Sequence, residues 1–196
     1  MEDQSVGTRQ LEFFNYAQGK YLHLGQVEAK EYKNSHLIVD DRRSNNKLYR
    51  VVQFGYPNID PGVENILHIQ VINFDFSKGS FDEGLSPLAK QKCISAVEMR
   101  GDLVVILCEE DHTISFMLIS ENGNIKLLQK ATFAGQVDGD SEDAKVEYLK
   151  LILIRHSSSA YQVYLQVRTS SQIDGLAFII ETYEVFIDDD NFKVFH

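Results

Sequence analysis

The residues best suited to acid–base chemistry or metal binding, the six histidines, are scattered along the chain. They are His23, His36, His68, His112, His156 and His196. No two of them stand at a metal-ligand spacing such as His-x-x-x-His. His23 and His68 alternate with apolar neighbours in YLHLG and ILHIQ, as side chains do on the less buried face of a strand. We therefore expect no metal site and no general base among the histidines.

An acidic cluster at residues 138–143, DGDSED, spaces its carboxylates at alternate positions as a calcium-binding loop does. It lacks the glycine that such a loop needs at its sixth position, where Asp143 stands. Leu149 occupies the place of the closing bidentate glutamate. We interpret the cluster as a solvated loop and expect neither a metal ion nor any other cofactor.

A second acidic cluster lies between an apolar run that ends at Ile187 and the run FKVF. A series of like charges there favours an exposed turn, and it also offers a patch to a basic peptide. With the strand that follows, it supplies the candidate partner-binding residues. These are Asp188, Asp189, Asp190, Phe192, Lys193 and Phe195.

Three short motifs that are typical of enzymes do not occur in the sequence. Gly-x-Ser-x-Gly, which exposes a nucleophilic serine, is absent. So are the phosphate-binding glycine-rich loop and the dinucleotide fingerprint. We predict that the protein is not an enzyme but a protein–protein interaction or scaffold module. The alternative is a sandwich or barrel domain that binds a small ligand or peptide.

The charge of the chain indicates which classes of partner it can bind. The net charge is −10 and no cluster of lysine and arginine is present, so contacts with nucleic-acid phosphates are poorly provided for. The same charge opposes docking on anionic membranes. We expect the partners to be other protein subunits, with no nucleic acid and no membrane. The acidity suits a basic partner, although ordinary solubility explains it equally well.

The two cysteines, Cys93 and Cys108, lie in runs that read as strands. Free cysteine behaves as a small buried apolar residue, which fits both places, and a disulfide between them remains possible. The N-terminus has no apolar signal core. The longest apolar runs are far shorter than the roughly 18 residues that span a bilayer. We expect a cytoplasmic or nuclear location.

The elements that would position these residues are strands, because apolar residues alternate nearly everywhere. Residues 160–168, AYQVYLQVR, place Tyr161, Val163, Leu165 and Val167 on one face. Residues 67–76 alternate and then change phase, which predicts a bulge or a strand buried on both faces. Asn122-Gly123 is a strong hairpin signal.

Less regular stretches separate the strands. Residues 77–92 and 134–144 are polar and without sustained alternation, so they are predicted to be loops. Residues 26–34, QVEAKEYKN, have a composition that favours a helix but form one turn at most.

About thirteen predicted strands fall into groups of four. The groups cover residues 10–54, 93–132 and 146–195, and the strand at 66–76 stands between the first two. Each group has roughly the length of one four-stranded propeller blade. We expect a single all-β domain over residues 1–196, built of propeller-like four-stranded antiparallel blades in a partial ring. The alternative is a β-sandwich or barrel.

This grouping resembles the blades of WD40-like propellers. The chain has no tryptophan, and it lacks the Gly-His and Trp-Asp pairs of those repeats, so the resemblance depends on spacing. Residues 95–111, SAVEMRGDLVVILCEED, followed by TISFMLIS at 113–120, are similar to the C-terminal propeller blades of anaphase-promoting complex subunit four. That resemblance implies a scaffold role in a ubiquitin-ligase assembly.

Overall fold

The computed structural model describes residues 8–30, 32–40, 48–57, 67–75, 80–88, 93–120, 124–133, 145–171, 175–188 and 191–196. All regular elements in this part are strands, and neighbouring strands pair antiparallel. The chain is therefore all-β, as its alternating pattern predicts. It divides into two compact units, one with the strands up to residue 88 and one with the strands from residue 96. No helix in the described part has the length and apolar character needed to span a bilayer.

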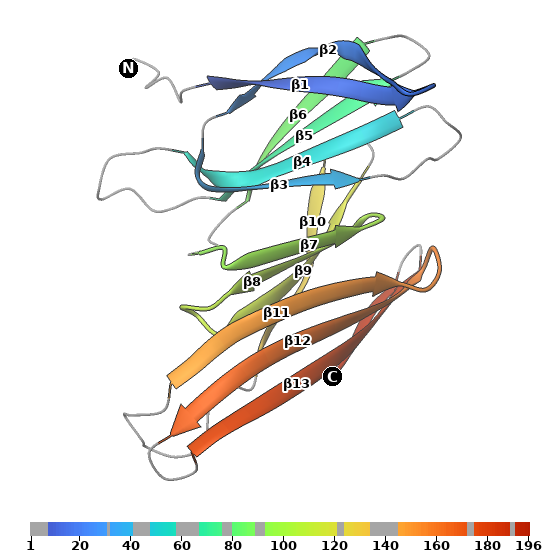
Figure 1. Cartoon of the computed structure of the whole chain (residues 1–196). Helices are drawn as coiled ribbons and strands as arrows, with labels where there is room; N and C mark the ends of the chain where they lie inside the picture. The colour runs from blue at the N-terminus through green and yellow to red at the C-terminus, as the bar shows by residue number, and fades with distance from the viewer. Residues whose placement is uncertain are drawn as a thin grey trace. The chain divides into compact units, whose positions relative to one another are not determined.

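The first unit contains a two-stranded and a four-stranded sheet (Figure 1). The two-stranded sheet consists of β1 (Thr8–Ala17) and β2 (Lys20–Lys30). The four-stranded sheet consists, in chain order, of β3 (Tyr32–Asp40), β4 (Leu48–Pro57), β5 (Leu67–Asp75) and β6 (Ser80–Leu88). Gln18 and Gly19 connect β1 to β2 with positive φ angles of 53° and 77°, the backbone that a tight two-residue hairpin requires.

A small core joins these two sheets. Val27 of β2 is buried with Val51 of β4 and Ile72 of β5, and half-buried Leu11 and Phe13 of β1 pack against them. The hairpin therefore covers the face of the four-stranded sheet with its apolar side.

Two predictions for this unit are wrong. Residues 10–54 do not form one quartet, because β1 and β2 pair only with each other in the described part and β3 and β4 continue into β5. The predicted loop at 77–92 contains the strand β6. Among the described strands β6 lies at the edge of its sheet, a position that tolerates Pro87, so the usual alternation is missing.

The stretch 26–34, for which one helical turn at most was predicted, belongs to two strands in its described part. β2 extends to Lys30 and β3 begins at Tyr32. Helix-favouring composition is a weak preference, and the pairing of Thr8 with Lys30 and of Tyr32 with Pro57 outweighs it.

The second unit contains two four-stranded sheets, each in chain order (Figure 1). One consists of β7 (Ala96–Arg100), β8 (Leu103–Cys108), β9 (Thr113–Ile119) and β10 (Ile125–Thr132). The other consists of β11 (Lys145–Arg155), β12 (Ala160–Ser171), β13 (Gly175–Asp188) and β14 (Asn191–Phe195). The predicted hairpin is present, because Ile119 pairs with Ile125. Its turn residues 121–123 and the predicted loop at 134–144 lie outside the described residues.

One core holds these two sheets together. Phe116 and its neighbours on β8 and β9 pack against one face of the β11–β14 sheet. On β12 this face carries Tyr161, Val163, Leu165 and Val167, all buried, which confirms the predicted alternation. Every residue of β8 is buried, so that strand is covered on both faces.

The sheets resemble propeller blades in their topology. Each four-stranded sheet is a simple antiparallel meander, and the first strands of the two sheets in the second unit, β7 and β11, approach each other. The backbone N–H of Tyr148 on β11 donates to Glu109 Oε1 over 2.9 Å. Among the described strands no pairing connects one sheet to another, so the sheets are open and do not close as a barrel. The described part of the chain thus consists of one two-stranded sheet and three propeller-like four-stranded antiparallel sheets.

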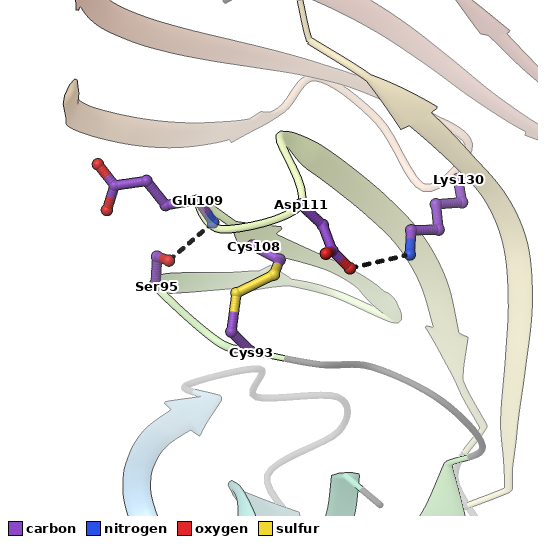
Figure 2. Close-up of a disulfide and its surroundings, with 6 residues drawn as sticks. All are labelled: Cys93, Ser95, Cys108, Glu109, Asp111 and Lys130. Carbon is purple, nitrogen blue, oxygen red and sulfur yellow. Dashed lines mark hydrogen bonds and ion pairs between the residues drawn. A yellow bond between two sulfur atoms is a disulfide. The ribbon is translucent and has the colours of Figure 1, made fainter. Parts of the chain in front are cut away.

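A disulfide joins Cys93 to Cys108 beside β7 and β8 (Figure 2). Of the two alternatives the disulfide is the one that forms, so neither cysteine is a free thiol. Cys108 lies in β8 as predicted, whereas Cys93 precedes β7. The pairing of Ala96 with Leu107 brings the segment before β7 next to the end of β8. The Ser95 N–H donates to the Leu107 carbonyl over 2.8 Å, and the Glu109 N–H donates to Ser95 Oγ over 2.9 Å. The bond therefore fastens the start of the second unit, before β7, to the end of β8.

Candidate protein-binding site

The β11–β14 sheet is buried on one face and exposed on the other. Its inner face packs in the core described above, and its outer face carries large apolar side chains that are 38% to 65% exposed. These are Ile152, Ile154, Phe178, Ile180, Phe186 and Phe195. Several large apolar side chains exposed on one face of a sheet make this face a candidate for an interaction site.

A pocket of about 610 Å³ lies on this sheet at the β13–β14 hairpin, and its volume falls in the range of about 300–1,000 Å³ that binding pockets occupy. It is lined by Ser159, Phe186, Ile187, Asp188, Lys193 and Phe195. The rings of Phe186 and Phe195 lie 6.1 Å apart, edge to face. The pairing of Phe186 with Lys193 and of Glu184 with Phe195 places all four side chains on the outer face. The pocket thus combines two aromatic rings with one charge of each sign.

Three of the six predicted partner-binding residues, Asp188, Lys193 and Phe195, line this pocket. Phe192 pairs with Ile187 and packs against the core on the inner face, so its main role is structural. Asp189 and Asp190 lie outside the described residues.

The prediction from sequence missed Phe186 and Ser159. Phe186 belongs to the run LAFIIETYEVFI, in which apolar residues occupy both faces of the strand. Such a run does not show which face of the strand is buried. In the structure Val185 is buried, so its neighbour Phe186 lies on the outer face.

A buried polar cluster on the inner face of β13 was also missed. Glu181 is only 5% exposed, and Tyr183 donates its hydroxyl hydrogen to Glu181 Oε2 over 2.6 Å. His196 Nε2 lies 3.6 Å from the same oxygen, and the His196 and Tyr183 rings are 4.9 Å apart. The cluster therefore links the end of β14 to β13. A carboxylate inside an otherwise apolar strand pattern, in IIETY, was its signal in the sequence.

This cluster predicts a specific loss of stability in alkali. Burial, the hydrogen bond to Glu181 and that carboxylate's charge raise the pKa of Tyr183 far above its usual range. The unfolded chain ionises this tyrosine from about pH 10, while the folded chain keeps it neutral. The stabilisation that the neutral Tyr183 hydroxyl provides is fully present below about pH 10. Above about pH 10 the free energy of unfolding should fall by about 1.4 kcal/mol per pH unit.

Urea unfolding between about pH 9 and 11 measures this slope. Burial also raises the pKa of Tyr148, which adds a slope of the same sign. The difference between the native chain and Tyr183→Phe isolates the contribution of Tyr183. Parallel pH profiles for the two proteins would contradict the prediction.

Within the described residues, no group of three or more histidine, cysteine, aspartate or glutamate side chains is arranged to hold a metal ion. The pocket is lined by two aromatic rings and by one side chain of each charge, Asp188 and Lys193.

Comparisons with known proteins show little similarity. No protein-family model matches the chain, and no curated protein matches it. A solved structure described as the N-terminal domain of Nup159 is similar at 12% sequence identity and a TM-score of 0.35. The match covers 89% of this chain and 39% of that chain. A likeness at this level supports no argument about fold or function, which therefore depend on the structure itself.

Proposed function

We propose that this protein is a non-enzymatic interaction or scaffold module that binds another protein through the outer face of the β11–β14 sheet. The observation that carries the proposal is the exposed aromatic pair, Phe186 and Phe195, at the mouth of a pocket. Aromatic side chains dominate the energetics of protein interfaces when a partner covers them.

The composition of the outer face favours a partner that binds reversibly. Gln162, Tyr164 and Gln166 of β12 are half-buried on this face, between the apolar residues of β11 and β13. Interfaces that never separate are more uniformly hydrophobic. A mixed surface remains compatible with water when the partner is absent.

A basic partner suits the net charge of the chain, which is −10. The pocket itself carries one charge of each sign, Asp188 and Lys193. Opposite charge accelerates encounter, so association should be faster at low salt.

A small ligand is a poorer occupant of the pocket. Binding sites for small molecules bury about 70–90% of the ligand surface. The pocket walls Phe186 and Phe195 are themselves 45% and 53% exposed, so the pocket accommodates one side chain of a larger partner better. The narrower scaffold role, in an assembly of the anaphase-promoting complex type, has only the resemblance at residues 95–120 in its favour.

Removing the two aromatic rings should weaken binding of the partner. We expect Phe186→Ser with Phe195→Ser to reduce recovery of a bound protein by on the order of tenfold, because each ring contributes at the centre of the contact. The measurement is quantitative mass spectrometry of proteins captured from cell extract.

The matched control is Leu127→Ser on β10, which changes a 52% exposed apolar residue outside the outer face. The control should still capture the protein that the double variant fails to capture. Capture of the same proteins by the double variant, the control and the native chain would contradict the proposed site.

A further inference from the structure

Strand β13 is much longer than β14, the strand that pairs with it on the side away from β12. β13 comprises Gly175–Asp188, but β14 pairs only with Glu184–Asp188. Residues 175–183 pair with β12 on one side, and no described strand pairs with them on the other. Figure 1 shows β12 and β13 running together along this length. A stretch of strand edge is therefore open in the part of the chain that the structure describes.

One hydrogen bond reveals which backbone groups point to the open side. The N–H of Ile187 donates to the Ser159 carbonyl over 2.8 Å, on the β12 side. Backbone groups alternate along a strand, so the odd-numbered residues of β13 point toward β12. The N–H and C=O groups of Phe178, Ile180 and Thr182 consequently point away from β12.

The side chains along this edge differ between the two faces. Phe178 and Ile180 lie on the outer face and are 59% and 65% exposed. Glu181 lies on the inner face and is almost fully buried, with the His196 ring 3.6 Å from its carboxylate. A strand placed here would meet apolar side chains on one face and a carboxylate on the other.

We propose that the partner adds an extended segment as a strand beside residues 176–182 and directs a basic side chain toward Glu181. This inference rests on the proposed function, because it specifies how a protein partner binds to the same sheet. The backbone of the segment pairs with Phe178, Ile180 and Thr182, which supplies affinity without a particular sequence. Its outward side chains cover Phe178 and Ile180.

The buried carboxylate specifies the chemistry of the partner. An arginine or lysine keeps its charge at all physiological pH values, whereas the imidazole of His196 is charged only when protonated. A cation from the partner therefore adds a permanent positive charge beside Glu181, next to the Tyr183 hydroxyl and the His196 ring. A second copy of this chain is a poor occupant, because each copy carries a net charge of −10.

The open edge is tested first in the free protein, by hydrogen exchange observed by NMR. We expect the amides of Phe178, Ile180 and Thr182 to exchange on the order of 100-fold faster than those of Ile179, Glu181 and Tyr183. Equal protection of the two sets would show that the edge is already covered and would overturn the inference.

Binding is tested with the acetylated and amidated peptide Val-Thr-Val-Arg-Val-Thr-Val and its counterpart with a central glutamate. The arginine peptide should shift the amide signals of Phe178, Ile180 and Thr182 and bind about tenfold more tightly than the glutamate peptide. Glu181→Gln, which keeps an acceptor for Tyr183, should abolish this preference. The absence of binding, or a preference unchanged by Glu181→Gln, would overturn the inference.

Two substitutions at one position separate backbone pairing from side-chain contact. Ile180→Pro removes an N–H that β12 does not use, and proline is tolerated at strand edges, so the fold should persist. Ile180→Pro should lower the affinity for the arginine peptide by at least about tenfold. Ile180→Ala, which keeps the N–H, should lower this affinity less. Equal affinities of these two variants would argue against strand addition.

The edge and the pocket fail independently. If the peptide binds as described but Phe186→Ser with Phe195→Ser keeps every captured protein, the edge inference stands and the pocket proposal is wrong. If the double variant loses its partner and the peptide never binds, the pocket proposal stands and the edge inference is wrong.

Discussion

Replacing both cysteines, as Cys93→Ser with Cys108→Ala, is expected to lower the free energy of unfolding by about 3 kcal/mol. The bond closes a loop between residues 15 positions apart, and opening it returns that conformational freedom to the unfolded chain. Alanine is chosen for Cys108 because this side chain is fully buried, and a serine hydroxyl there would add a separate cost. Urea unfolding followed by circular dichroism measures the change.

The native chain in the presence of a reductant is the control, and it should unfold at the same urea concentration as the double variant. A difference below about 1 kcal/mol between oxidised and reduced native protein would contradict the prediction. The result also matters for location, because disulfides persist in oxidising compartments and are reduced in the cytosol and nucleus. The expected cytoplasmic or nuclear location would thus leave the segment before β7 without its covalent link.

Tyr183→Phe is expected to lower the free energy of unfolding by about 2–3 kcal/mol, the cost of removing a hydrogen bond to a buried charged group. The Tyr183 hydroxyl donates to Glu181 over 2.6 Å, and that carboxylate has almost no access to water. Without the hydroxyl, Glu181 loses its buried donor on β13. The ring itself remains in contact with Phe116, whose centroid is 5.6 Å away, so packing changes little.

Tyr161→Phe is the matched control in the same sheet. Tyr161 is equally buried, but its hydroxyl donates over 3.4 Å to the uncharged carbonyl of Ser158. Its loss should cost about 1 kcal/mol or less. Thermal and urea unfolding of the three proteins measure the comparison, and similar costs for the two tyrosines would contradict the importance of Glu181.

The strand content was predictable from sequence because alternation is a local property. Tyr161, Val163, Leu165 and Val167 are buried on one face as their spacing indicates. The quartets β7–β10 and β11–β14 follow from short turns, since a short connection forces neighbouring strands to pair. β6 was missed because an edge strand with a glycine and a proline has no alternating apolar face.

The candidate site was predictable only in part. Asp188, Lys193 and Phe195 line the pocket, and a charged turn before a short apolar strand was sufficient to indicate them. Phe192 differs from Phe195 only in the face to which it points, and that face depends on its pairing with Ile187. The face to which Phe186 points likewise depends on strand pairing, so the sequence alone did not indicate it.

The sequence by itself determined that this chain forms strands, where most of them lie, and which turns join them, because these depend on residues close together in the chain. The tertiary structure alone decided that Cys93 meets Cys108, that Glu181 is buried beside Tyr183 and His196, and that β14 pairs only with Glu184–Asp188 of β13. Each of these depends on register and on the relative lengths of paired strands. A shift of one residue would turn every side chain of β13 to the other face, and nothing in a local pattern prevents such a shift.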